Sequence, residues 1–168
     1  HCLRNLNANE EYVLFYVNAP SVIIGRHQNP FEECNSSYLQ KKDIYLARRI
    51  SGGGAVYHDK GNLNFSFITD FGEEKLDYFK KLLQPVIETL KRLGVPAELA
   101  DKNDIIVHGQ KISGNSQHAN MRRMLSHGTL LFEADLDTLR QVLKPDLQIV
   151  ESHAVASIPS SVTNISSY

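Results

Sequence analysis

Apolar and polar residues alternate along the chain in a pattern that predicts short strands mixed with helices. Runs rich in β-branched and aromatic residues, separated by turns containing Gly, Pro or Asn, are typical of strands. The predicted strands are residues 13–18, 21–25, 44–51, 55–58, 62–69, 104–108, 111–117 and 124–134. Because strand and hairpin signals outnumber helical ones, the pattern predicts an α+β fold, with a mixed or antiparallel sheet flanked by helices.

The clearest helical signal covers residues 73–93, where apolar residues recur three or four positions apart and form one stripe. Pro85 lies within this stretch, so we expect either a kink or two consecutive helices. Gly94 is a natural helix stop. Asn35 and Asp135 each precede a shorter helical pattern, and both residue types are good N-caps.

The composition of the 168 residues is that of a soluble globular domain, with 42% hydrophobic and 22% charged residues. The formal net charge of −1 gives no overall attraction to nucleic acid or to an anionic membrane. Two cysteines, Cys2 and Cys34, are too few for a disulfide framework, so we expect a cytoplasmic protein, or a mitochondrial one if its source is eukaryotic. Residues 26–30 and the tail from Glu151 show no regular pattern.

A first candidate site is the glycine-rich segment, in which Arg48 and Arg49 precede three consecutive glycines at residues 52–54. Glycines let backbone N–H groups approach a ligand and permit positive φ, and arginines supply fixed cations for phosphate or carboxylate. The segment therefore suits a nucleotide phosphate. A flexible turn beside two solvated arginines has the same composition, and the residues alone leave both interpretations open. The spacing fits neither a Walker loop nor a dinucleotide fingerprint.

A second candidate site is residues 102–114, where Lys111 stands in a predicted strand that ends at Gly114. A lysine in this place can neutralise charge on a carboxylate and a phosphate together. Asp104 is a candidate Mg²⁺ ligand, because Mg²⁺ takes carboxylate and phosphate oxygens. An exposed edge-strand lysine beside a turn aspartate is the alternative interpretation of this segment.

Residues 47–67, ARRISGGGAVYHDKGNLNFSF, closely resemble the lipoate-binding motif of lipoate–protein ligases and lipoyltransferases. Further segments match that family in the same order: residues 22–35, 102–117 and 127–136. The resemblance implies an α+β catalytic domain shared with biotin–protein ligases. Family members usually carry a strand and a helix before the matched region and often a C-terminal accessory domain. We therefore expect residues 1–168 to be a catalytic domain without those parts.

The activity that the resemblance implies is ATP-dependent. Lipoate and ATP, with Mg²⁺, would give lipoyl-AMP and pyrophosphate. The lipoyl group would then pass to a lysine of an apo lipoyl domain, either in a 2-oxoacid dehydrogenase complex or in the glycine cleavage H protein. Neither nucleic acid nor a membrane is an expected partner.

The family's site residues carry over by position. Lys111 is implied as the catalytic lysine, which touches both the lipoyl carbonyl and the phosphate. Implied contacts to ATP or the adenylate come from Arg49, Gly54, Ala55, Val56, Tyr57, Asn103, Asp104 and Lys111. Implied contacts to lipoate come from Ser51, Gly53, His58 and Lys111, and Asp104 is the implied Mg²⁺ ligand.

Two alternatives to the ligase remain open at this point. The first has the same fold and is a lipoyltransferase, which accepts preformed lipoyl-AMP but does not make it. From another class, a non-catalytic module that binds lipoyl domains or a nucleotide would share many of the same residues. An octanoyltransferase is disfavoured, because its chemistry uses a cysteine near the lysine motif and neither Cys2 nor Cys34 lies there.

Overall fold

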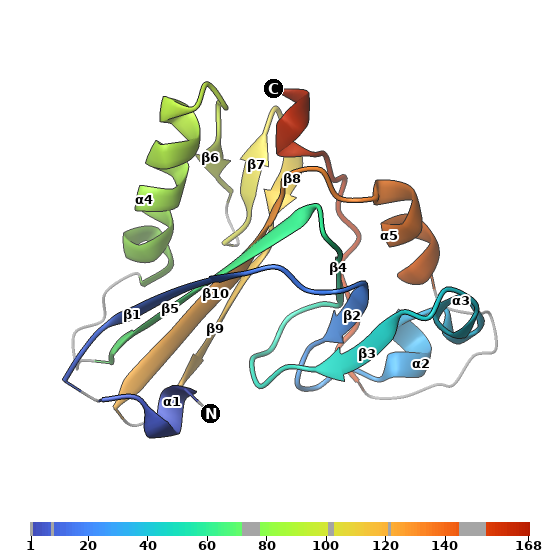
Figure 1. Cartoon of the computed structure of the whole chain (residues 1–168), viewed down its shortest axis with the longest axis horizontal. Helices are drawn as coiled ribbons and strands as arrows, with labels where there is room; N and C mark the ends of the chain where they lie inside the picture. Colours follow the sequence, from blue (N-terminus) through green and yellow to red (C-terminus); the bar gives the residue numbers. More distant parts are fainter. Residues whose placement is uncertain (1, 8, 72–77, 101–102, 121, 145–153) are drawn as a thin grey trace. The chain divides into compact units, whose positions relative to one another are not determined.

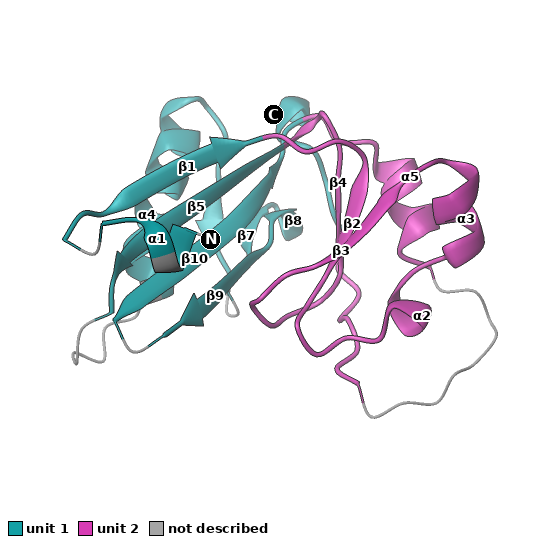
Figure 2. Cartoon of the chain, turned by 60° about the horizontal axis from the view of Figure 1, so that its bottom comes forward, with its two compact units in different colours: residues 1–16, 63–132, 161–168 teal, residues 17–62, 133–160 magenta. Residues whose placement is uncertain are grey.

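The computed structural model describes residues 2–7, 9–71, 78–100, 103–120, 122–144 and 154–168. Backbone contacts divide the chain into two units (Figure 2). Unit 1 comprises residues 1–16, 63–132 and 161–168, and unit 2 comprises residues 17–62 and 133–160. The expectation that residues 1–168 form one catalytic domain stays a prediction.

Unit 1 is built on a four-stranded sheet in the order β1-β5-β10-β9 (Figure 1). Strand β1 is antiparallel to β5, and β9 is antiparallel to β10. The register places the exposed Phe15 opposite the fully buried Phe65. The strands are β1 (Tyr12–Tyr16), β5 (Asn62–Asp70), β9 (Asn115–Ala119) and β10 (Arg123–Leu131).

A smaller antiparallel sheet of unit 1 has the order β6-β7-β8 and carries the second candidate site. Its strands are β6 (Glu98–Leu99), β7 (Ile105–Val107) and β8 (Gln110–Ser113). The core joins helix α4 (Tyr78–Arg92) to both sheets of the unit. It contains Phe65, Leu83, Ile87, Leu90, Val95, Ala97, Ile105, Val107, Ile112 and Ile165.

Helix α4 confirms the long helical stripe over residues 78–92, and the first residues of the predicted stretch, 73–77, lie outside the described ones. One helix runs through Pro85, so the option of two consecutive helices is wrong. Gly94 follows its end with a φ of 90°, a conformation that glycine adopts without a Cβ penalty.

Unit 2 has a three-stranded mixed sheet in which β2 (Ser21–Ile24) is central. It runs parallel to β3 (Tyr45–Arg48) and antiparallel to β4 (Val56–His58). Helices α3 (Ser36–Lys41) and α5 (Leu136–Val142) lie side by side and pack on this sheet (Figure 1). Their shared core contains Val22, Ile24, Cys34, Leu39, Ile44, Tyr57 and Val142.

Polar caps fix where the helices of unit 2 begin. The side chain of Asn35 accepts a hydrogen bond from Tyr38 N at 2.7 Å, which confirms the predicted cap of α3. Asn29 caps the short helix α2 (Pro30–Glu33), with Pro30 as its first residue. The sequence pattern did not predict α2. Its start fits the preference of Pro for the first helical position.

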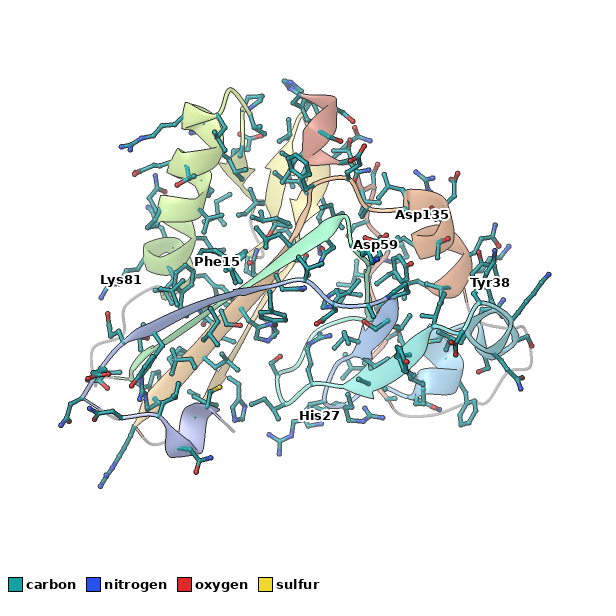
Figure 3. The ribbon with its side chains drawn as sticks, viewed as in Figure 1. Phe15, His27, Tyr38, Asp59, Lys81 and Asp135 are labelled. Carbon is teal, nitrogen blue, oxygen red and sulfur yellow. The ribbon has the colours of Figure 1, made fainter. Side chains whose placement is uncertain are left out.

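Asp59 and Asp135 lie close together in unit 2, and their contact closes the turn between β4 and β5 (Figure 3). The Asp59 carboxylate accepts from Gly61 N at 2.9 Å and from Asp135 N at 2.8 Å. A Cβ at Gly61 would collide with the carbonyl of Glu133, so the turn requires glycine. Two remaining short elements are α1 (Cys2–Asn5) and the 3₁₀ turn η1 (Ile165–Ser167).

The mixture of sheets and flanking helices confirms the predicted α+β class. Among the described residues, no helix has the length and apolar character needed to cross a membrane.

Candidate functional site

The glycine loop of unit 2 connects β3 to β4 and spans residues 49–55. Gly53 has a φ of 91°, a left-handed backbone that favours glycine. Its carbonyl oxygen lies so close to Gly25 that a Cβ at that position would overlap it. The loop is therefore packed tightly against the end of β2.

Arg49 binds the loop's own backbone. Its Nη1 donates to Ile23 O at 3.0 Å, and its Nη2 donates to Gly52 O and Gly54 O at 2.7 Å each. Nε adds a longer bond to Gly52 O at 3.2 Å. Burial lowers the pKa of this guanidinium, which nevertheless stays a cation in proteins. In this structure the arginine shapes the loop by holding its carbonyls inward.

The neighbouring Arg48 acts on the preceding loop. Its Nη1 donates to the carbonyl oxygens of Gly25, Arg26 and Gln28, at 2.9, 3.2 and 2.7 Å. The side chain thereby ties β3 to residues 25–28. Arg48 and Arg49 thus organise two adjacent loops, and the contact of Arg49 with the adenylate stays a prediction.

A polar cluster beneath the glycine loop was missed in the sequence. The carboxylate of Glu33, only 5% exposed, accepts from Ser157 N at 3.0 Å and from the Ser157 hydroxyl. Ser157 Oγ in turn accepts from Ala55 N at 2.9 Å and from Gln28 Nε2 at 3.0 Å. The buried Gln28 also accepts from Gly25 N at 2.9 Å. The cluster joins residues from three separate parts of the chain, so no local motif predicts it.

The remaining implied residues of this unit have distinct surroundings. Ser51 is 1% exposed at the base of the loop. Val56 pairs with Ile23 of β2 and Tyr57 pairs with Val22, and the side chain of Tyr57 is in the hydrophobic core. Burial, reinforced by the charges of Asp59 and Asp135, raises the pKa of Tyr57 to about 12.

His58, at the end of β4, is buried, with its Nδ1 3.0 Å from Asn18 Nδ2. This contact joins the end of β4 to Asn18 and holds the imidazole ring in place.

Lys111 stands on β8 of unit 1, where the backbone is paired on both sides. It lies opposite Ile106 of β7 and forms a parallel bridge with Val162. Lys111 N donates to Ser161 O at 2.8 Å, and Lys111 O accepts from Thr163 N at 3.0 Å. The alternative of an exposed edge strand does not describe this position, because the backbone of Lys111 is hydrogen-bonded to residues 161 and 163 and its side chain is only 25% exposed.

The ammonium of Lys111 lies 2.9 Å from Asp104 Oδ2, and both side chains are about a quarter exposed, at 25% and 26%. A Cβ at Gly114 would come within 3.0 Å of both Nζ and Cε of Lys111. The absence of a side chain at Gly114 thus makes room for the lysine. Two of the implied site residues, Lys111 and Asp104, are in direct contact.

Asn103 precedes this pair and adopts a φ of 84°, which Asn tolerates better than most residues. Its side-chain amide donates to the carbonyl of Asn115, and Asn115 Nδ2 donates back to Asn103 O at 2.7 Å. This reciprocal pair fixes the turn that carries Asp104. The sequence motif included Asn115 without suggesting this contact.

The implied site residues therefore form one group in each unit. Unit 2 brings together the loop residues Arg49, Ser51, Gly53, Gly54 and Ala55 and the strand residues Val56, Tyr57 and His58. Unit 1 brings together Asn103, Asp104 and Lys111. Among the described residues, no three His, Cys, Asp or Glu side chains gather into a metal-binding cluster.

A family model described as the lipoyl protein ligase A/B catalytic domain matches residues 1–168. The chain belongs to this family. The resemblance inferred from four ordered motifs is confirmed, and the α+β fold that it implied agrees with the structure.

Curated relatives include the lipoate-protein ligase LplJ of Bacillus subtilis, which is 50% identical over 168 residues, all of this chain and 51% of the relative. Lipoate–protein ligase 1 of Staphylococcus aureus is 47% identical over the same share of each chain. The chain spans about half the length of the curated relatives it matches.

Solved structures with the same fold include a protein from T. acidophilum with bound lipoic acid. It is 32% identical, with a TM-score of 0.84 over 99% of this chain and 68% of that one. A lipoate-protein ligase A bound with ATP is 34% identical, with a TM-score of 0.81 over 86% and 64%. A bipartite lipoate protein ligase from Thermoplasma acidophilum, described together with its E2 lipoyl domain, is 37% identical, with a TM-score of 0.77 over 83% and 56%.

Proposed function

We propose that this chain is the catalytic part of a lipoate–protein ligase, which uses ATP to convert lipoate into lipoyl-AMP and then transfers the lipoyl group to a lysine of a lipoyl domain. The observation that carries the proposal is the fixed ammonium of Lys111, on a doubly paired strand beside Asp104, in a chain of this family. Relatives named as ligases, and related structures with lipoic acid or ATP bound, support the same activity.

In the first step of the proposed reaction, a carboxylate oxygen of lipoate attacks the α-phosphorus of ATP and pyrophosphate leaves. In the second step, a lysine amine of the acceptor attacks the lipoyl carbonyl, AMP leaves and the amine loses a proton. Negative charge builds first on the α-phosphate and then on the carbonyl oxygen. A fixed cation stabilises both transition states, which is the role we assign to Lys111. No covalent enzyme intermediate is required.

The glycine loop has the complementary role of binding the adenylate. We assign adenylate contacts to Arg49 and residues 54–57, lipoate contacts to Ser51, Gly53 and His58, and the shaping of the loop also to Arg49. The support for this assignment is the loop's fixed conformation, in which the carbonyls of Gly52 and Gly54 face the guanidinium of Arg49. Donors that are already oriented need little reorganisation when the charge develops.

Asn103 and Asp104 are assigned to the nucleotide and its Mg²⁺. A single carboxylate suits this ion, because Mg²⁺ in nucleotide sites is held by one or two carboxylates together with phosphate oxygens and water. Asp104 is about a quarter exposed and therefore open to a ligand. The ion would neutralise phosphate charge, while Asp104 would orient Lys111 and anchor the nucleotide.

The proposed acceptor is an apo lipoyl domain of a 2-oxoacid dehydrogenase complex or of the glycine cleavage H protein. The supporting comparison is the bipartite ligase from T. acidophilum, described together with its E2 lipoyl domain. A cytoplasmic location belongs to the same proposal and is supported by the free thiols of Cys2 and Cys34.

The test incubates the full-length protein with lipoate, ATP, Mg²⁺ and an apo lipoyl domain, and measures the intact mass of the acceptor. The expected result is a mass increase of one lipoyl group, which requires ATP and is lost when the acceptor lysine is replaced by arginine. Lipoate-dependent exchange of pyrophosphate into ATP tests the first step alone. Transfer from preformed lipoyl-AMP without such exchange would replace the ligase by a lipoyltransferase, and no transfer from either source would overturn the proposal.

A further inference from the structure

We propose that Ser157, held by the buried carboxylate of Glu33, is a positioning residue that fixes the Gly54–Ala55 peptide and thereby determines which N–H groups of the glycine loop face the adenylate. This inference rests on the proposed function, in which the loop binds the adenylate. Neither the family motifs nor the sequence pattern gave these two residues a role.

The Gly54–Ala55 peptide is held at both of its polar ends. Ala55 N donates to Ser157 Oγ at 2.9 Å, and Gly54 O accepts from Arg49 Nη2 at 2.7 Å. In a trans peptide the C=O and the N–H point in opposite directions. Arg49 and Ser157 therefore bind the Gly54–Ala55 peptide on opposite sides. The peptide cannot rotate without breaking one of these two hydrogen bonds.

The carboxylate of Glu33 gives the Ser157 hydroxyl its direction. The two carboxylate oxygens of Glu33 accept hydrogen bonds from Ser157 N and from the Ser157 hydroxyl. The two lone pairs of Ser157 Oγ then accept hydrogen bonds from Ala55 N–H and from Gln28 Nε2. A hydroxyl has one donor and two acceptor positions, and all three are used here. An amide in place of Glu33 would present a donor to one of these groups and weaken the arrangement.

This geometry separates the loop's donors into two kinds. Ala55 N–H donates its hydrogen bond to Ser157 and is therefore not available to donate to a ligand. The Gly52–Gly53 peptide differs, because its Gly52 O faces Arg49, so that its Gly53 N–H points away from the guanidinium. Gly53 is also exposed and lacks a Cβ. We therefore assign the loop N–H that faces the lipoyl-adenylate to Gly53, at the lipoyl end of that ligand, whereas Ala55 contacts the ligand through atoms other than its N–H.

Packing makes the contact between Ser157 and the loop specific. A Cβ placed on Gly54 would lie 2.9 Å from Ser157 Oγ and 3.3 Å from its Cβ. Ser157 thus lies directly against the loop. A shift of this side chain is passed to the Gly54–Ala55 peptide.

The experiment measures the affinity of the full-length protein for a non-hydrolysable sulfamoyl analogue of lipoyl-adenylate by calorimetry. The variants are Ser157→Ala, Glu33→Gln and the double variant. The controls are Ser160→Ala, an exposed serine of the same segment, and Glu32→Gln, the neighbouring glutamate on α2. Hydrogen exchange of the Ala55 amide, without ligand, reports the loop itself.

Each single variant is expected to raise the Kd of the analogue about tenfold, the effect of losing one oriented hydrogen bond. The double variant should be no weaker than about the worse single one, because Glu33 acts through Ser157. Ala55 exchange should accelerate in Ser157→Ala, the KM for the apo lipoyl domain should not change, and the controls should bind within about twofold of wild type.

The two levels of the proposal fail differently. If the wild-type protein does not bind the analogue, the proposed function is wrong. If the wild type binds, and the folded fraction of Ser157→Ala and of Glu33→Gln binds equally well, the positioning role is wrong, even where thermal stability has fallen. Additive effects in the double variant would also overturn it, because Glu33 would then act by another route.

Discussion

The carbonyl oxygen of Gly52 accepts two hydrogen bonds from Arg49, from Nε at 3.2 Å and from Nη2 at 2.7 Å. Charge-assisted bonds of this kind are stronger than neutral ones. They draw the carbonyls of the loop toward the guanidinium and turn the opposite N–H groups away from it. The arginine therefore sets the conformation of the loop.

Arg49→Lys tests whether shape or charge is decisive. An ammonium keeps the charge but cannot span the carbonyls of Ile23, Gly52 and Gly54 in one plane. We expect adenylate binding to weaken by about 1–3 kcal/mol, the range for hydrogen bonds to a charged group. Calorimetry with a lipoyl-adenylate analogue measures this. The exposed Arg92→Lys is the control, and equal affinity in Arg49→Lys and wild type would refute the shaping role.

Gly25→Ala should damage the fold, whereas Gly52→Ala should not. A Cβ at Gly25 would overlap the carbonyl of Gly53, but a Cβ at Gly52 meets no atom within 4 Å. Overpacking of this kind costs about 1–3 kcal/mol. Denaturant unfolding of both variants gives the comparison. Similar free energies of unfolding for the two would show that the loop is free to move away from β2.

Asp135→Ala should lower the free energy of unfolding by about 1 kcal/mol through loss of the N-cap of α5. The carboxylate accepts from Thr138 N at 2.9 Å, from Thr138 Oγ1 at 2.8 Å and from Asp137 N at 3.1 Å. The hydrogen bonds from Thr138 are the main reason why the pKa of Asp135 is lower than its usual value. Because the folded state lowers the pKa, this stabilisation is present above the ordinary value of 3.8 and is lost as the pH falls through the lower, folded one.

Unfolding measured from pH 7 down to pH 3 checks this prediction, with Asp137→Asn as the control in the same turn. Asp137 is almost fully exposed, at 94%, and forms an ion pair with Arg140, which is 59% exposed, so its replacement should change little. A pH profile of Asp135→Ala parallel to that of wild type would contradict the assignment.

Local patterns in the sequence predicted much of the fold. The caps Asn35 and Asp135 and the helical stripe over α4 depend on residues within a few positions of each other, so a single sequence reveals them. The chemistry-bearing motifs likewise located the glycine loop and the pair of Lys111 and Asp104.

Such local signals do not reveal contacts between residues that are far apart in the sequence. Ser157 reaches Glu33 across 124 positions of the chain, and it lies in a tail without periodicity. The bridge from Lys111 to Val162 joins β8 to the same irregular tail. Strand β6, only two residues long, has too few positions for an alternating pattern. These features depend on tertiary packing, which sequence spacing does not encode.

Cys34 should make the protein sensitive to alkaline pH. Burial, with the Glu33 charge as a lesser cause, raises the pKa of its thiol from 9.0 to about 11. A group whose pKa is raised on folding contributes stability below its unfolded pKa, and that contribution disappears as the pH rises toward the folded one. The free energy of unfolding should therefore fall between about pH 9 and pH 11.

Cys34→Ala should flatten this alkaline fall while lowering stability at pH 7, because it removes a buried side chain. In a Cys2→Ser background the native thiol of Cys34 should resist Ellman's reagent at pH 8 and react after unfolding. Rapid reaction of the native protein would show that the thiol is not sealed in the core.

Lys111→Ala should slow transfer of the lipoyl group from lipoyl-AMP by about 10²–10³-fold, as for loss of an oxyanion-hole donor. Lys111→Arg should rescue poorly, because a planar guanidinium does not fit the place of a compact ammonium. Gly114→Ala should give an intermediate loss, since its Cβ would lie 3.0 Å from Nζ and displace it. Single-turnover transfer to an apo lipoyl domain measures all three, with the exposed Lys91→Ala as control. Near wild-type rates in Lys111→Ala would defeat the assignment, and a lipoyl adduct trapped on Lys111 would make it a nucleophile instead.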